Sequence, residues 1–287
     1  MEAIEARSDA ITRQRFRLSL SAWAGVFILV FWLFIAFFGP ALAPFSESDF
    51  VSDDSFLPIG RAFLLGTDYI GRDLLSRLFH GTRLTLGMAL LATLIASTVG
   101  SSLGIFSAIK GGGVDMLLCR INDALVSIPG IMMGLVVIAA LGSSIPILIC
   151  TTGLVYACSV FRIARALGMD LMVMDYVEVA RARGESVWWI LGHEIFPNAA
   201  IPLIVDFGIR LSFAIRFMSS LSFLGLGVQP PHADWGSMVR ENLVGLNAQS
   251  MAPIIPALAI ASLTIGLNLI VDDYVARSGQ EVAKRIT

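Results

Sequence analysis

The side-chain types that perform catalysis or bind metals are sparse in this sequence and do not form the usual patterns. The three histidines occur singly, at His80, His193 and His232, without an HExxH zinc motif or a GxSxG nucleophile turn. The three cysteines lie in or beside apolar runs, which favours small buried hydrophobes over a disulfide or a metal site. Neither Lys110 nor Lys284 lies in a GxxxxGKS or GxxxxGKT phosphate loop, so ATP hydrolysis by this chain is not expected. We therefore predict no catalytic residue, no metal site and no cofactor bound by the chain itself.

Three ionisable residues, Asp206, Arg210 and Arg216, interrupt an otherwise apolar stretch. Charges inside a membrane cost on the order of 2.5–3.5 kcal/mol each on insertion scales, so they need a partner or water. Asp206 and Arg210 are four residues apart on one helix face, which favours a structural ion pair. Arg216 lies about 80° round the helix from Asp206. It can extend to the interface or line a translocation path. We take Asp206, Arg210 and Arg216 as residues of the translocation path, in which the two arginines favour anionic solutes.

A charge-rich segment at 176–198 separates two long apolar runs. Helix formers over 168–182 precede Gly184, which can supply a turn. Ser186 can cap a second short helix that should end before Pro197. The pattern predicts two short helices with a break between them, and a plain solvated loop between two membrane spans is the alternative.

The composition requires a membrane. Hydrophobic residues make up 56% of the 287 residues, charged residues only 15%, and the mean hydropathy is +0.79. A helix needs about 20 apolar residues to span a bilayer. An all-α polytopic protein with six transmembrane helices is therefore expected. The expected spans are 20–40, 84–109, 117–141, 147–165, 199–225 and 252–271.

Local features refine these spans. A cleaved signal peptide is the alternative for the first, but no small-residue cleavage site follows it. The GxxxG at 100–104 suits close helix contact, and Pro129 should kink the third span. Between the first two spans, 64–79 is expected to form an interfacial helix within an outer segment at 41–83. The remaining divisions are an N-terminal segment at 1–19, a five-helix core at 84–275 that includes the loop 168–197, and a tail at 276–287.

Positive charge sets the expected orientation, because loops rich in arginine and lysine stay in the cytoplasm. With the N-terminus inside, six spans place both termini in the cytoplasm, together with Lys110, Arg162, Arg165 and the 176–198 segment. The outer side keeps five arginines: Arg61, Arg72, Arg77, Arg83 and Arg240.

The 176–198 segment resembles the EAA loop of ABC-importer permeases, through Glu178, Ala180, Gly184 and Pro197. Val179 and Phe196 depart from that pattern conservatively. In that family the loop is a coupling helix seated in a groove of a separate ATPase subunit.

The resemblance implies that Glu178, Ala180 and Gly184 form the core of an ATPase-docking element. Arg181 and Arg183 would lie on its polar surface, and Ala180 would let the partner approach closely.

Two further segments narrow the resemblance. LGTDYIGRD at 65–73 and LSFLGLGVQPP at 221–231, followed by DWGSM at 234–238, resemble signatures of C-type permeases of dipeptide, oligopeptide and nickel importers. The likeness implies that Asp234 and Trp235 lie in an outer loop that faces a binding protein. Trp235 as an interfacial anchor is the alternative.

The resemblance implies one half of a heterodimeric pore in a bacterial inner membrane, surrounded by lipid. Its partners would be a homologous second permease, two ATPase subunits that bind ATP and Mg, and a periplasmic solute-binding protein, with no nucleic acid. Transport would proceed by alternating access. Peptides are the expected cargo, and nickel, an oligosaccharide or an anionic sugar or amino-acid conjugate are alternatives. A secondary transporter is disfavoured, because no inverted repeat is evident and Asp206 is the only clearly mid-span carboxylate. An intramembrane enzyme lacks a catalytic set.

Overall fold

The structure, a computed structural model, describes residues 19–286, with side chains described through residue 277. Within that part of the chain the regular elements are helices, and extended segments pair only in two isolated bridges. The α-helices are α2 (Leu20–Leu42), α3 (Leu74–Lys110), α4 (Gly112–Val126), α5 (Gly130–Leu141), α6 (Ile145–Met172), α7 (Asp175–Ala182), α8 (Val187–Ile190), α9 (Phe196–Phe223), α10 (Trp235–Glu241) and α11 (Ile254–Ile286). A π-helical turn at Leu191–Ile195 joins α8 to α9, and a 3-10 turn at Leu243–Leu246 follows α10.

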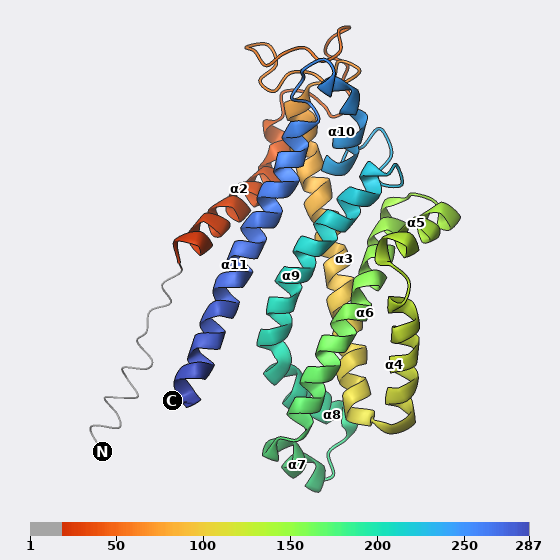
Figure 1. Ribbon diagram of the computed structural model, residues 1–287, viewed down its shortest axis with the longest axis vertical. Helices are drawn as coiled ribbons and strands as arrows, with labels where there is room; N and C mark the ends of the chain where they lie inside the picture. Colours follow the sequence, from red (N-terminus) through yellow and green to blue (C-terminus); the bar gives the residue numbers. More distant parts are fainter. Residues whose placement is uncertain (1–18, 287) are drawn as a thin grey trace, which may run out of the picture.

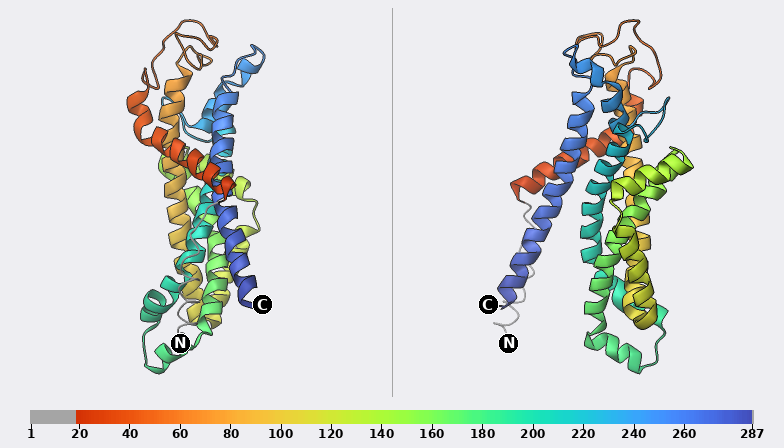
Figure 2. Two further views of the ribbon diagram at one scale, coloured as in Figure 1. Left: turned by 90° about the vertical axis from the view of Figure 1, so that its left-hand side faces the viewer. Right: turned by 45° about the vertical axis from the view of Figure 1, so that its right-hand side comes forward.

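The long helices α3, α6, α9 and α11 run along the length of the molecule, with α7 and α8 at one end and the loops of residues 43–73 at the other (Figure 1). Helix α2 crosses α11 obliquely, as Figure 2 shows from two more sides. The closest pairing is α3 on α6. A Cβ on Gly100 would lie 2.6 Å from the Ala157 carbonyl oxygen, and one on Gly104 2.5 Å from that of Phe161. The GxxxG pattern therefore marks a real helix contact, because any side chain there would force the two helices apart.

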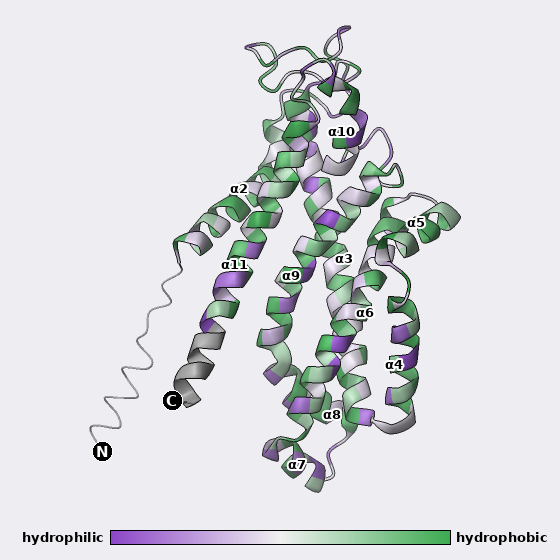
Figure 3. Cartoon of the chain, in the orientation of Figure 1, coloured by the Kyte–Doolittle hydropathy of each residue, from purple (hydrophilic) through white to green (hydrophobic). Residues whose placement is uncertain are grey.

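Among the described residues, four helices are long and apolar enough to cross a membrane: α2, α3, α6 and α11. The pair α4–α5 adds a fifth if it counts as one broken span, since the two helices diverge by 84° on either side of Pro129. The all-helical, multi-pass architecture and the kink at Pro129 are thus confirmed. Helix α9 is not among these apolar helices. Its sequence contains three charged residues, and purple, hydrophilic bands interrupt the green of α9 in Figure 3. Its place in the membrane depends on what covers those charges.

The prediction of a separate interfacial helix at 64–79 is wrong. Residues 64–73 form a looped segment, and its last residue, Asp73, caps α3 by accepting a hydrogen bond of 2.8 Å from the Ser76 amide. Gly66 and Gly71 adopt positive φ angles of 81° and 78°, which exclude a helix there. The apolar spacing after residue 73 is the first two turns of α3, so this span begins ten residues before the expected position 84.

The prediction that the second helix of the 176–198 segment ends before Pro197 is wrong. Helix α8 continues through the π-helical turn into α9, and Pro197 occupies the first turn of α9. A proline is tolerated there because it directly follows the π-helical turn, where the Phe196 amide donates to the Leu191 carbonyl oxygen five residues back and the regular i→i−4 ladder is already interrupted. The tail expected at 276–287 is likewise no separate segment, since α11 continues to Ile286. Of the N-terminal segment 1–19, all but residue 19 lies outside the described residues.

Candidate functional site

The α7–α8 segment is a helix–turn–helix whose inner side packs on the rest of the chain. Val177 and Ala180 are fully buried in a cluster with Ile105 of α3 and Ala164 of α6. The expectation that Ala180 faces a partner is therefore corrected: its small side chain allows α7 to lie close to its own helices. Glu178 is exposed on the opposite side.

The outward side of this segment combines charge with apolar surface. Arg181 and Arg183 are exposed, and the Arg183 guanidinium lies 5.5 Å from the centre of the Trp189 ring. Val179 is 56% exposed and Trp188 70% exposed. The sequence pattern had indicated the charged residues but not this apolar surface. Exposed aromatic and arginine side chains together are typical of protein interfaces.

The turn between α7 and α8 depends on Gly184, whose φ is +79°. Its amide donates to the Arg181 carbonyl oxygen (2.9 Å), and the Glu185 amide donates to the Ala180 carbonyl oxygen (3.2 Å), so the last carbonyls of α7 are satisfied. Ser186 then caps α8 by accepting from the Trp189 amide at 3.2 Å. The predicted turn and cap are both confirmed.

The three charged residues of α9 fall into two environments. Asp206 is buried, and its Oδ1 lies 3.1 Å from Nη2 of the half-buried Arg210, which is the ion pair expected from their spacing. Arg216 is exposed and has no carboxylate within ion-pair distance among the described side chains. Its guanidinium lies 4.6 Å from the centre of the Phe213 ring. Arg216 is thus a positive charge held by an aromatic face and open to an anion.

Two open hollows meet at Arg216. One, of about 570 Å³, extends along α9 and α11 past Ser219 and Ser220. The other, of about 800 Å³, extends in the opposite direction past Asn268 and Asp272. Arg216 is therefore accessible along the α9–α11 groove from both directions.

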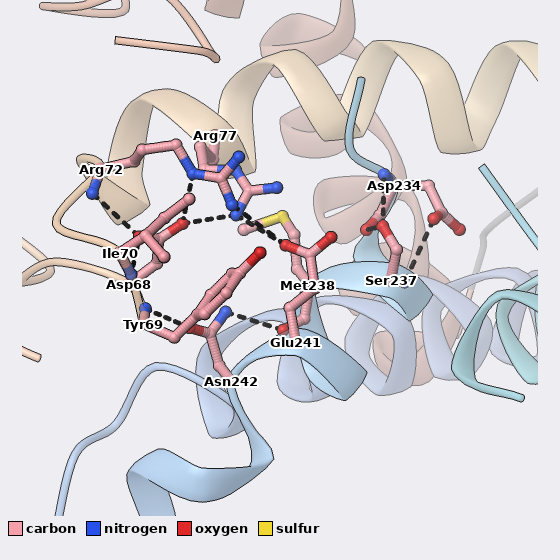
Figure 4. Close-up of polar contacts among 10 residues, drawn as sticks. All are labelled: Asp68, Tyr69, Ile70, Arg72, Arg77, Asp234, Ser237, Met238, Glu241 and Asn242. Atoms are coloured by element: carbon pink, nitrogen blue, oxygen red, sulfur yellow. Dashed lines mark hydrogen bonds and ion pairs between the residues drawn. The ribbon is translucent and has the colours of Figure 1, made fainter. Parts of the chain in front are cut away.

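At the other end of the molecule, the 65–73 segment forms a buried ion network (Figure 4). Asp68 accepts from Arg72 Nε (2.7 Å) and Arg77 Nη1 (2.5 Å), as well as from the backbone amides of Ile70 and Arg72. Glu241 of α10 accepts from Arg72 Nη2 at 3.1 Å and Arg77 Nη1 at 3.0 Å. Two arginines thus neutralise two carboxylates, and the network joins the looped segment to α3 and α10.

Asp234 and Trp235 do not form the docking surface that we had expected. Trp235 is fully buried, its ring centre lies 4.7 Å from that of Trp32, and its backbone amide donates to Thr85. Asp234 is also buried and caps α10 through a reciprocal pair of hydrogen bonds with Ser237. Both side chains are part of the internal packing that holds α10, so within this chain neither forms an exposed docking surface and Trp235 is not placed as an interfacial anchor.

Asp234 gives a pH-dependent prediction. Its Oδ2 is buried without a hydrogen-bond partner, and burial raises the pKa of Asp234. Since the folded pKa lies above the unfolded value, stability falls as pH rises from about 3.9 towards the raised value. Asparagine keeps the capping oxygen without the charge. We expect the melting temperature of Asp234→Asn, relative to that of the native protein, to rise with pH.

Melting curves in detergent at a series of pH values measure this effect. Asp53→Asn, in an exposed loop, is the control for the loss of one negative charge. A constant difference between Asp234→Asn and the native protein at every pH would contradict the prediction.

Together, an all-helical chain with four or five apolar helices and a helix–turn–helix exposed at one end define a multi-pass membrane protein. The chain belongs to the family described as binding-protein-dependent transport system inner membrane component, whose pattern matches residues 100–283. The pattern of the N-terminal TM domain of oligopeptide transport permease C matches residues 10–58. The protein is thus a transport permease of an inner membrane.

Similar proteins match over most of their length. The chain is 31% identical to the glutathione transport system permease protein GsiD of Pectobacterium atrosepticum, over 91% of this chain and 86% of that protein. It is 32% identical to the dipeptide transport system permease protein DppC of Haemophilus influenzae, over 90% and 89%. It is 33% identical to the probable D,D-dipeptide transport system permease protein DdpC of Escherichia coli, over 85% and 82%.

Proposed function

We propose that this chain forms half of the transmembrane pathway of an ABC importer for small peptides. The observation that carries the proposal is the similarity, over most of the chain, to permeases named for dipeptide and glutathione transport. These names favour peptides over nickel or an oligosaccharide. A homologous second permease, two ATPase subunits and a periplasmic binding protein complete the transporter, and ATP and Mg are bound by the ATPases.

The α7–α8 segment is proposed to dock on an ATPase subunit in the cytoplasm, with both chain termini on that side. Its exposed Glu178, Arg181, Arg183 and Trp188 supply the contact surface. Because α8 continues into α9 without a loop, a displacement of the segment is passed to the helix that carries Arg216. Nucleotide binding to the ATPases would in this way bias the pathway between two states.

Arg210 and Arg216 are proposed to line the translocation path, with Asp206 orienting Arg210. Arg216 is the more direct contact for cargo, because Arg210 is already paired. A peptide carboxylate can approach Arg216 along either hollow and form a charge-assisted, bidentate contact.

This arrangement predicts different outcomes for two substitutions. Arg216→Gln should lower uptake of a dipeptide with a free carboxylate by roughly tenfold or more relative to the dipeptide amide, whose C-terminus is neutral, because a hydrogen bond to a charged group contributes about 1.5–3 kcal/mol. Arg210→Gln should instead lower the amount of folded protein, because it leaves the Asp206 carboxylate buried without its partner.

Uptake into proteoliposomes that contain the ATPases and the binding protein measures the first effect, and size-exclusion profiles measure the second. Arg61→Gln, in an exposed outer loop, controls for loss of one positive charge. Equal loss of uptake for both peptides by Arg216→Gln, with poor folding, would make Arg216 a structural residue. Copurification of the chain without any ATPase subunit would contradict the proposed function itself.

A further inference from the structure

On the side of α6 away from α11, the chain forms a partly open apolar cavity. Its volume is about 470 Å³, and α3, α4, α5 and α6 all contribute to its walls. Among the lining residues are Leu103, Leu125, Val137, Cys150 and Leu154. Along α6 the lining extends from residue 146 to residue 161, or about 22 Å at 1.5 Å per residue. That length exceeds the hydrocarbon depth of one leaflet, about half of ~30 Å.

A smaller, polar pocket continues this cavity towards α7. It measures about 270 Å³ and shares two lining residues, Asn122 and Phe161, with the apolar cavity. The other residues that line it include Asp123 of α4 and Arg162 of α6. The combined hollow is therefore amphiphilic: a long apolar chamber ends in a small charged pocket on the side that faces the α7–α8 segment.

Some of the polar groups of this pocket are paired within the chain, and others are available to a ligand. Arg165 is already committed to Asp115, at 2.5 Å and 2.6 Å. Arg162 and Asp123, in contrast, have no ion-pair partner among the described side chains, and both are exposed. Asn122 is 6% exposed and lines both hollows, so its amide is a further polar group where the chamber meets the pocket.

From this geometry we propose that the hollow binds a phospholipid with a zwitterionic phosphate–ammonium headgroup. One acyl chain fills the apolar chamber, the phosphate binds Arg162, and the ammonium group binds Asp123. Asn122 lies between chamber and pocket, where the ester oxygens of the glycerol would be. One cation and one carboxylate side by side complement a zwitterion better than a purely anionic headgroup.

Two other candidate occupants of the hollow, a peptide cargo and a helix of another subunit, fit its walls less well than a phospholipid. A peptide cargo carries amide groups along its whole length, which the apolar chamber cannot satisfy. A helix of another subunit would fill the chamber with side chains, but it would leave Arg162 and Asp123 to find partners of their own. The lipid site does not depend on the identity of the cargo.

Lipid retention tests the site in the assembled transporter. The transporter is reconstituted in vesicles with equal amounts of phosphatidylethanolamine, phosphatidylcholine and phosphatidylglycerol, then extracted, and the retained lipids are counted by native mass spectrometry. Phosphatidylethanolamine should be retained over the other two, because only its headgroup has both a phosphate and an N–H donor. Arg162→Gln should lower retention of all three by about tenfold. Asp123→Asn should abolish the preference for phosphatidylethanolamine over phosphatidylglycerol.

Two further variants separate the site from general effects. Arg120→Gln changes an exposed arginine on α4 that lines neither hollow, and it should retain lipid as the native protein does. Cys150→Trp narrows the chamber, so it should lower retention of every lipid without changing the headgroup preference. Equal retention of the three lipids by the native protein would overturn the proposal, and so would identical behaviour of Arg162→Gln and Arg120→Gln.

A crosslinking experiment addresses the competing occupant. In a chain whose Cys119 and Cys158 are replaced by alanine, a photoreactive group on Cys150 should label lipid. Crosslinks from Cys150 to another subunit would assign the hollow to a subunit contact, and the lipid proposal would fail.

Discussion

Replacing Asp68 by asparagine should destabilise the protein by on the order of 3–5 kcal/mol, the usual cost of removing one partner from a buried ion network. Asp68 is fully buried and accepts hydrogen bonds from two guanidinium groups. After the substitution, Arg72 and Arg77 would share Glu241 as their single carboxylate partner among the described residues. Two atoms of Arg77, Nε and Nη2, already have no hydrogen-bond partner. The melting temperature in detergent and the amount of folded protein in the membrane measure the loss.

The matched control is Asp54→Asn, which removes a carboxylate from the same outer loop at an exposed position. It should leave the melting temperature nearly unchanged. Adding Arg77→Met to Asp68→Asn should cost less than the sum of the two single changes, because each breaks the same network. Fully additive effects, or a small effect of Asp68→Asn alone, would show that the network does not hold the outer loop.

Those parts of the fold that depend on residues close together in the sequence could be predicted from it. The apolar run of α2 was found to within two residues of its end. The break at Pro129, the turn at Gly184 and the Asp206–Arg210 pair also follow from local rules of backbone conformation and helix spacing. None of these features needs a contact with a distant part of the chain.

The ion network could not be predicted in this way. Its donors lie at Arg72 and Arg77, but the carboxylate that completes it, Glu241, is 169 residues from Arg72 in sequence. No periodicity connects the two segments. A sequence signal was nevertheless present, since the nine residues of the 65–73 segment hold two carboxylates, an arginine and two glycines. Charges so dense within a glycine-containing loop are typical of an internal network as well as of a binding surface.

The errors in the candidate site have a related cause. Trp235 and Asp234 were assigned to an outer surface because the resemblance to C-type permeases implied a loop that faces a binding protein. Their burial comes from contacts with Trp32 and Thr85 in other helices. Pro197 was interpreted as a helix end, although a proline in the first turn of a helix is equally compatible with the sequence. Such choices depend on tertiary packing, about which a single sequence carries little information.

Gly184→Val should uncouple ATP hydrolysis from transport. At φ +79° a β-branched residue is strained by roughly 1–3 kcal/mol, so the α7–α8 turn should change its conformation. No atom lies within 4 Å of the position that a Cβ would occupy, which means that a steric clash contributes nothing. The α7–α8 surface would then be presented at a different angle to the ATPase. Uptake and ATP hydrolysis, measured on the same proteoliposomes with the copurified ATPase quantified, distinguish loss of coupling from loss of assembly.

Two companion variants isolate the backbone angle as the cause. Gly184→Asn should retain much of the transport, because asparagine adopts positive φ more readily than other residues with a Cβ. Gly192→Val adds the same side chain at a position in the same segment that also has open space but no positive φ, and it should transport normally. Normal transport by Gly184→Val at normal expression would contradict the proposed coupling role of this turn. Transport should therefore decline in the order glycine, asparagine, valine at position 184 and stay normal with valine at position 192. This order follows only if the turn must keep its left-handed conformation while the ATPase moves it.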